Sequence, residues 1–75
     1  PFTEGLFAEL ELERPSPIQL RITDVQGRQV YFSEIPGTAG LNRIELRGDI
    51  FPATGLYTVQ VIASSKIRVE KVVKK

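Results

Sequence analysis

Residues 18–32 read IQLRITDVQGRQVYF, which is two alternating segments on either side of a turn. Before the turn, apolar residues occupy every second position: Ile18, Leu20 and Ile22. This two-residue period is typical of a β-strand with one buried face. Asp24 can accept hydrogen bonds from the backbone and Gly27 tolerates a positive φ, so the pair predicts a type I turn with a bulge. The stretch therefore predicts a β-hairpin.

The turn also predicts how the two strands pair. Asp24 is expected opposite Arg28. The cross-strand pairs that follow are Ile22 with Val30 and Leu20 with Phe32. In this register both apolar rows lie on one side of the hairpin, whereas a slip by one residue would place Gln29 and Tyr31 in the core.

The two-residue period continues through the rest of the chain. The residues expected to face inward are Leu6, Ala8, Leu10 and Leu12, then Asn42, Ile44 and Leu46, then Tyr57, Val59, Val61 and Ala63, and finally Ile67 and Val69. Asn42 is the polar exception, and near a strand start it is expected to cap the preceding loop rather than to bind a ligand. Ile50 and Phe51 are expected to plug one end of the core.

The last strand is less regular than the others. Its alternation changes at Lys71, so we expect the strand to bulge near Glu70 or to end there. Six strands, a candidate seventh in residues 48–55 and no segment of helical period predict an all-β fold. We expect an immunoglobulin-like β-sandwich of six to seven antiparallel strands.

Composition argues against catalysis. The 75 residues allow one domain, expected to span residues 1–75. A domain of this size buries only about 60% of the surface that its unfolded chain exposes. Without histidine or cysteine the chain lacks the usual base for a serine nucleophile, thiolate zinc ligands and disulfides. The carboxylates Glu9, Glu11 and Glu13 predict a solvated row, and Asp24 and Asp49 lie outside any calcium-loop pattern. We expect no enzyme activity, no metal and no cofactor.

Charge is unevenly distributed, although the net charge is only +1. The start of the chain is acidic and residues 66–75 are basic. Blocks of this kind that alternate with Val and Ile are usually the solvated face of a strand, so nucleic acid is not an expected partner. We expect partner contact at the last five residues, Lys71, Val72, Val73, Lys74 and Lys75. No apolar run approaches the roughly 20 residues that span a bilayer, so no transmembrane segment is expected, and a signal peptide would lie in a longer precursor.

Four short segments occur in an informative order. They are Pro1-Phe2, Asp24-Val25-Gln26-Gly27-Arg28 followed by Val30, Gly55-Leu56-Tyr57, and Lys71-Val72-Val73-Lys74-Lys75. In their order and spacing the chain resembles, over nearly all of its length, the C-terminal sorting domain of proteins exported by the type IX secretion system of Bacteroidetes. Members carry one more residue before the Pro-Phe pair, so an upstream linker and cargo are expected before Pro1.

The resemblance implies a signal at the end of a larger exported precursor. The implied partners are the outer-membrane translocon of the type IX system, its sortase-like peptidase and an upstream cargo domain. The implied destination is the cell surface or the medium, reached through the periplasm, with removal of the domain in many members. A last strand with a basic end offers strand addition, Lys-to-acid pairing and weak self-association as means of contact.

The motif residues are also expected to have structural roles. Asp24 and Gly27 are expected to build the turn, Arg28 to pair with Asp24, and Tyr57 to pack in the core with its hydroxyl bonded to nearby backbone. An alternative class is an immunoglobulin-like adhesion or carbohydrate-binding module, including one similar to the immunoglobulin-like part of the flagellar hook-capping protein. The place of the domain in its gene separates these classes.

Overall fold

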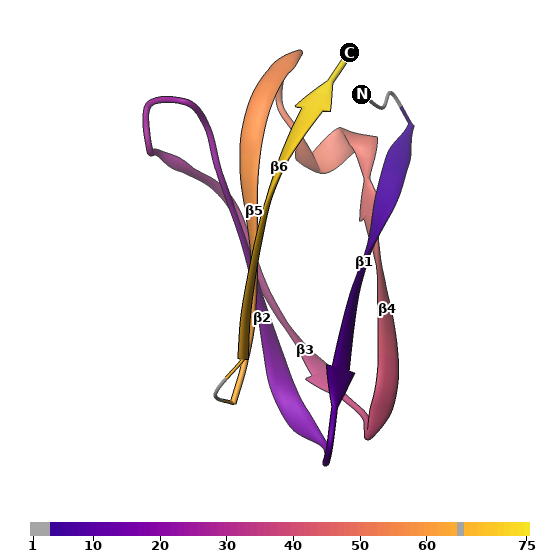
Figure 1. Cartoon of the computed structure of the whole chain (residues 1–75). Helices are drawn as coiled ribbons and strands as arrows, with labels where there is room; N and C mark the ends of the chain where they lie inside the picture. The colour runs from indigo at the N-terminus through magenta and orange to yellow at the C-terminus, as the bar shows by residue number, and fades with distance from the viewer. Residues whose placement is uncertain (1–3, 65) are drawn as a thin grey trace.

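The computed structural model describes residues 4–64 and 66–75 (Figure 1). The elements within these ranges are β1 (Gly5–Leu12), β2 (Ser16–Thr23), β3 (Gln29–Gly37), β4 (Gly40–Arg47), the 3-10 turn η1 (Gly48–Ile50), β5 (Gly55–Ala63) and β6 (Lys66–Lys74). The strands form two antiparallel sheets, one ordered β1–β4 and the other β3–β2–β5–β6. The predicted all-β, immunoglobulin-like sandwich is confirmed. The candidate seventh strand is instead η1 and the irregular segment that follows it.

The core lies between the two sheets and is built by alternate residues of β1, β2, β4 and β5, together with Phe51. Its buried members are Leu10, Leu12, Ile18, Leu20, Ile22, Ile44, Leu46, Phe51, Tyr57, Val59, Val61 and Ala63. Each large apolar side chain buried here contributes about 1.5–3 kcal/mol. Phe51 follows η1 and closes one end of the core, where its ring packs edge-on against Tyr57 with 5.1 Å between centroids. The predicted inward faces of β1, β2, β4 and β5 are therefore confirmed.

The predicted cap at the start of β4 is present. Asn42 accepts a hydrogen bond at Oδ1 from the backbone N–H of Thr38, with 2.8 Å between the atoms. Its Nδ2 donates to the carbonyls of Thr38, Gly40 and Leu10. One half-buried amide thus fastens the β3–β4 loop to β1, which explains a polar residue in an inward row.

The predicted register of the first hairpin is wrong beyond its turn. Asp24 does face Arg28, because its N–H donates to the Arg28 carbonyl at 2.9 Å. The register then shifts between Ile22 and Thr23. The observed cross-strand pairs are Ile22 with Tyr31 and Leu20 with Ser33. A bulge next to the turn changes the count by one, so Tyr31 faces the core and Phe32 lies on the outer face.

The predicted orientation of β6 is also wrong. Ile67 and Val69 are 64% and 54% exposed, on the outer face of the sheet. Their neighbours Arg68 and Glu70 pair with buried Val61 and Val59, so these charged side chains share the inner face. The expected break at Lys71 is absent from the described part of β6, where pairing to β5 is continuous from Lys66 to Lys74. Val72 therefore points inward, where it is half-buried against the core.

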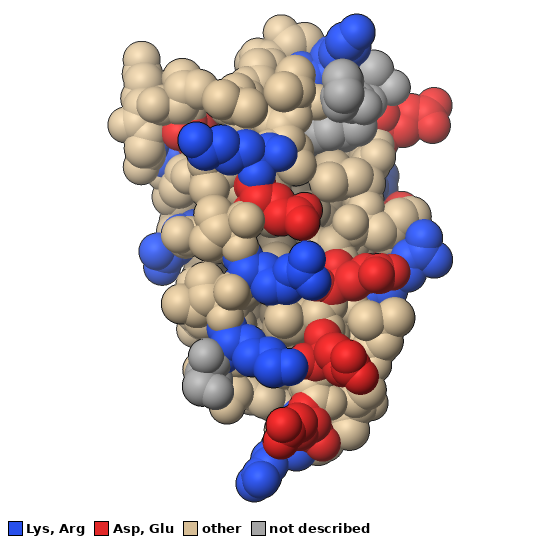
Figure 2. All heavy atoms as spheres, viewed as in Figure 1, with Lys and Arg blue, Asp and Glu red and all other residues tan. Residues whose placement is uncertain are grey.

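Charged residues of β6 face inward because they reach the edge of the opposite sheet. Within residues 4–64 and 66–75, β4 is the only strand that pairs with β1, so one edge of β1 carries no strand. Lys66 Nζ donates to the Glu11 carbonyl at 2.6 Å, and Arg68 donates to the Glu9 carbonyl at 3.4 Å. Figure 2 shows the resulting seam, where rows of positive and negative side chains face each other. The aliphatic stems cover the core while the charged ends satisfy backbone carbonyls.

The two faces of the sheet are distinguished by one matched pair of substitutions. Ile22→Val removes a methyl group from a fully buried side chain and is expected to lower the free energy of unfolding by about 1 kcal/mol. Ile67→Val changes an exposed side chain and is expected to cost less than about 0.5 kcal/mol. Chemical denaturation of both variants measures the difference. Equal losses would mean that Ile67 faces the core after all.

Candidate functional site

Three of the four sequence motifs converge at one end of the four-stranded sheet (Figure 1). The β2–β3 turn, residues 24–28, lies beside the start of β5, and the start of β5 pairs with the end of β6. The cross-strand pairs that join them are Thr23 with Thr58, Thr58 with Lys71, Leu56 with Val73 and Gly55 with Lys74. The fourth motif, Pro1-Phe2, lies outside the described residues. Segments up to 50 positions apart in sequence thus form one surface, which we call the motif end.

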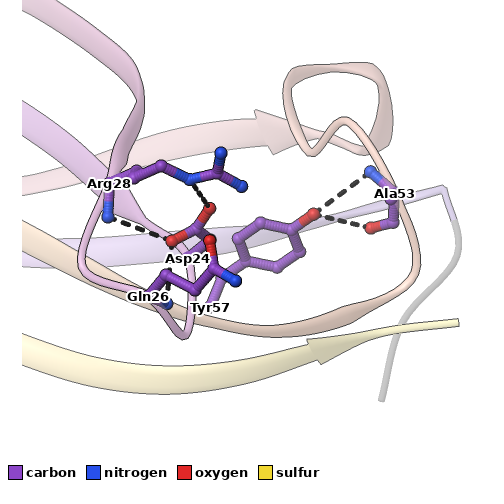
Figure 3. A network of polar contacts seen from close by, with 5 residues as sticks. All are labelled: Asp24, Gln26, Arg28, Ala53 and Tyr57. Atoms are coloured by element: carbon purple, nitrogen blue, oxygen red, sulfur yellow. Dashed lines mark hydrogen bonds and ion pairs between the residues drawn. The ribbon is translucent and has the colours of Figure 1, made fainter.

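The Asp-x-x-Gly-Arg segment is stabilised by hydrogen bonds among its own residues (Figure 3). Asp24 Oδ1 accepts from the backbone N–H groups of Gln26 and Arg28, at 2.9 and 3.0 Å, and Oδ2 accepts from Arg28 Nε at 3.0 Å. Gly27 has a φ of +82° and donates its N–H to the Asp24 carbonyl. Since a residue with a Cβ is strained at this φ, glycine is required to complete the turn. The turn contacts expected from the sequence are present.

The same contacts set the ionisation of Asp24. Partial desolvation raises the pKa of the carboxyl group, but the hydrogen bonds from the Arg28 backbone, the Arg28 side chain and the Gln26 backbone, with the Arg28 charge, lower it below the ordinary value of 3.8. Hydrogen bonds that favour the charged form depress a carboxyl pKa in this way. The ionised carboxylate is therefore the form that the turn stabilises.

Tyr57 connects the start of β5 to the loop after η1 (Figure 3). Its ring is buried, and its hydroxyl donates to the Ala53 carbonyl at 2.7 Å and accepts from the Ala53 N–H at 3.1 Å. These are the backbone contacts expected for this side chain. Gly55, with a φ of +146°, turns the chain into β5, and Leu56 then points to the outer face. The Gly-Leu-Tyr motif thus holds the loop after η1 through Tyr57 on the inner face of the sheet and exposes Leu56 on the outer face.

The basic tail divides into two sets of residues. Lys74 is half-buried, and its Nζ donates to the carbonyls of Gly48 and Phe51 at 2.8 Å each, so it holds the end of β6 to η1. Val72 packs against the core. Lys71 and Val73 lie on the outer face and, like Lys75, are exposed. Only this second set is open to a partner in the folded domain.

The motif end also includes a surface that the sequence analysis missed. Lys71 borders a shallow hollow of about 350 Å3 together with Asp24, Val25 and Leu56. Next to it, Val73 continues the exposed apolar row of Ile67 and Val69 along β6. The sequence did contain a signal for this surface, because Ile67, Val69, Lys71 and Val73 occupy alternate positions and therefore share one face of the strand. The hydrophobicity of Ile67 and Val69, however, led to the prediction that these two residues face the core.

Among residues 4–64 and 66–75 there is no group of three or more His, Cys, Asp or Glu side chains that could hold a metal ion. In the same ranges we find no helix long and apolar enough to cross a membrane.

The fold and its motif end define a small immunoglobulin-like module whose distinctive residues mostly support its own turns. The chain matches the family model of the secretion system C-terminal sorting domain over residues 1–75. It therefore belongs to this family of type IX secretion sorting signals from Bacteroidetes, whose members are destined for export to the cell surface or the medium. No curated protein and no solved structure matches the chain.

The Asp24 network predicts how the stability of the turn depends on pH. Because the folded-state pKa lies below the unfolded value of 3.8, ionised Asp24 stabilises the fold above pH 3.8, and this contribution is lost as pH falls through the folded-state pKa. Asp24→Asn is expected to lower stability at neutral pH and to flatten the acid limb of the stability curve. Denaturation from pH 2 to about pH 7 measures both effects. An unchanged acid limb would contradict the assignment.

The Tyr57 hydroxyl predicts a separate stability effect. Tyr57→Phe leaves the Ala53 N–H and carbonyl without their partner and is expected to cost about 1–2 kcal/mol. Tyr31→Phe is the matched control, since the Tyr31 hydroxyl makes no hydrogen bond within the described ranges, and it is expected to cost less than about 0.5 kcal/mol. Thermal and denaturant unfolding of the two variants provide the comparison. Similar losses for both would show that the Ala53 contacts contribute little.

Proposed function

We propose that residues 1–75 form the last domain of a larger exported precursor and act there as a non-catalytic signal. The outer-membrane translocon of the type IX system recognises the folded domain and moves the upstream cargo across. The observation that carries this proposal is the family match over all 75 residues. The absence of histidine and cysteine from the sequence supports a domain that binds and does not react.

The contact with the translocon is made by the tail, Lys71 to Lys75, as part of the motif end. In this proposal Lys71, Val73 and Lys75 touch the partner, because they are exposed. Val72 and Lys74 hold the strand in place through the core and through the carbonyls near η1. Exposed lysines around an exposed valine suit an acidic partner surface with an apolar centre.

Strand addition is the second component of recognition. β6 is an edge strand of the described sheet, with β5 on one side. An extended segment of the receptor can add to such an edge through main-chain hydrogen bonds, while the lysines select an acidic segment. The turn at Asp24 to Arg28 and the Gly-Leu-Tyr segment supply the shape that presents the strand.

Later steps follow from the same role. After passage through the periplasm and the outer membrane, the sortase-like peptidase of the system removes the domain and attaches the cargo to the cell surface, or the cargo is released. These steps act at the linker before Pro1.

A carbohydrate-binding role is less well supported. Sugar-binding modules commonly present aromatic side chains together on one face. The exposed aromatic residues in the described ranges, Phe7 and Phe32, lie on different sheets. Arg43 also covers the Phe7 ring at 4.0 Å from its centroid.

Charge reversal at the tail tests the proposal without disturbing the fold. Residues 1–75 are fused to the end of a secreted reporter in a bacterium with a type IX system, and Lys71→Glu/Lys75→Glu is expected to reduce surface or medium reporter at least about tenfold. Arg14→Glu/Arg43→Glu makes the same change in net charge away from the motif end and is the matched control. Export is measured by fractionation, and folding by protease resistance.

The possible outcomes distinguish a direct contact made by the tail lysines from an effect of overall charge. Undiminished export of the tail variant would remove these lysines from the mechanism. Equal loss in tail and control variants would point to overall charge and not to a contact. Failure of the unchanged fusion to be exported would overturn the sorting role itself.

A further inference from the structure

A cavity of about 190 Å3 lies at the seam between β1 and β6, the seam shown in Figure 2. Both sheets contribute to its apolar wall, which is formed by Leu6, Ala8 and Leu46 on one side and by Val59, Val61 and Val72 on the other. Leu46, Val59 and Val61 are at most 3% exposed. The cavity therefore extends from the seam to the core.

The strands on either side of the seam explain why this space is present. Ala8 occupies an inward position of β1 whose other members are leucines, so its short side chain leaves part of the wall unfilled. From β6, Lys66 reaches the β1 backbone at one end of the seam, and Lys74 reaches the carbonyls near η1 at the other end. Between them, Glu70 makes no hydrogen bond or ion pair with β1 in the described ranges, where its partner is Arg68.

Two opposite charges lie at the mouth of the cavity. Arg68 and Glu70 both line it, and Nη2 of Arg68 lies 3.6 Å from Oε1 of Glu70. Their side chains are 55% and 60% exposed, and the contact of Arg68 with the Glu9 carbonyl is 3.4 Å long. Because exposed ion pairs contribute little to stability, a solute can replace these long contacts at a small cost.

We infer that the cavity binds a free α-amino acid with a large apolar side chain. An apolar cavity of about 150 Å3 is known to hold a molecule of the size of benzene, so a benzyl or isobutyl group fits the space beside Ala8 and Leu46. The ammonium and carboxylate groups of an amino acid are attached to the same carbon atom. They can therefore meet Glu70 and Arg68 at the same time, each through a charge-assisted hydrogen bond.

The charges at the mouth select the zwitterion against simpler ligands. An apolar anion such as a fatty acid would bring its carboxylate close to Glu70, and an apolar amine would bring its ammonium group close to Arg68. Since both protein charges are exposed, burial of the apolar side chain supplies most of the affinity. The expected dissociation constant for phenylalanine is on the order of 1 mM.

This binding does not depend on the sorting role, because it requires only the folded domain and a small solute. Export that fails would leave the ligand site in place, and a domain that binds no amino acid would leave the sorting role in place. The purified domain therefore tests the inference independently of export.

Titration of the isotope-labelled 75-residue domain with phenylalanine, from about 0.1 to about 20 mM, tests the inference by NMR. Saturable shifts are expected at the methyl groups of Leu46, Val59 and Val61 and at the amides of Arg68 and Glu70. Alanine leaves the cavity unfilled and is expected to bind at least about tenfold more weakly. N-acetyl-phenylalanine and phenylalanine amide each lack one charge and are expected to bind at least about threefold more weakly.

Variants of the wall and of the mouth locate the site. Ala8→Leu fills the cavity with a side chain of the protein and is expected to abolish the shifts, with circular dichroism as the check on folding. Arg68→Gln and Glu70→Gln each remove one exposed charge and are expected to weaken binding at least about threefold. Arg43→Gln and Glu45→Gln make the same changes on the outer face of β4 and should leave binding unchanged.

Three results would overturn the inference. The first is a domain without saturable shifts in phenylalanine. The second is binding that neither Arg68→Gln nor Glu70→Gln weakens, or that N-acetyl-phenylalanine and phenylalanine amide match. The third is unchanged binding by a folded Ala8→Leu variant, which would place the ligand elsewhere. Should Ala8→Leu fail to fold, the two variants at the mouth decide.

Discussion

The contact between the inner row of β6 and the backbone carbonyls along one edge of β1 is the constraint that sets the orientation of the last strand. In the described ranges the edge has no neighbouring strand, and Lys66 and Arg68 of β6 donate to the Glu11 and Glu9 carbonyls across the seam. Both contacts are exposed, and the two cationic side chains that make them belong to the inner row of β6. Because successive side chains alternate, the apolar residues of β6 are then directed outward. The same alternation thus accounts for both the cationic contacts across the seam and the exposed apolar row of β6.

The family motifs support shape more than they offer reactive groups. Asp24, Gly27 and Arg28 form hydrogen bonds with one another within the turn. The Tyr57 hydroxyl forms its hydrogen bonds with the Ala53 backbone. The Lys74 ammonium group likewise donates to a backbone carbonyl in η1. What remains free at the motif end is a surface of backbone edge, exposed apolar side chains and lysines.

Part of the candidate site could be predicted from the sequence. The Asp24 turn and the Tyr57 contacts are local, within four residues, so residue type and spacing suffice to predict them. The convergence of residues 24–28, 55–57 and 71–74 could not be read in this way, because it requires the order of strands in the sheet. The division of the tail is of the same kind. Lys71 and Lys74 are chemically identical, and the face of β6 on which each lies, together with the position of η1, decides that Lys74 is engaged.

The sequence by itself determined the strands, their turns and the inward faces of β1, β2, β4 and β5. These elements lie beneath the opposite sheet, where burial of apolar area outweighs other terms and the hydrophobic row must face inward. Only the tertiary structure decided the face of β6 and the register beyond the first turn. At β6 the opposite sheet presents a backbone edge in place of an apolar face, and Arg68 faces in, within reach of the Glu9 carbonyl, while Ile67 faces out. In the hairpin, packing of Tyr31 against the core favours the register shift between Ile22 and Thr23, which the local pattern does not specify.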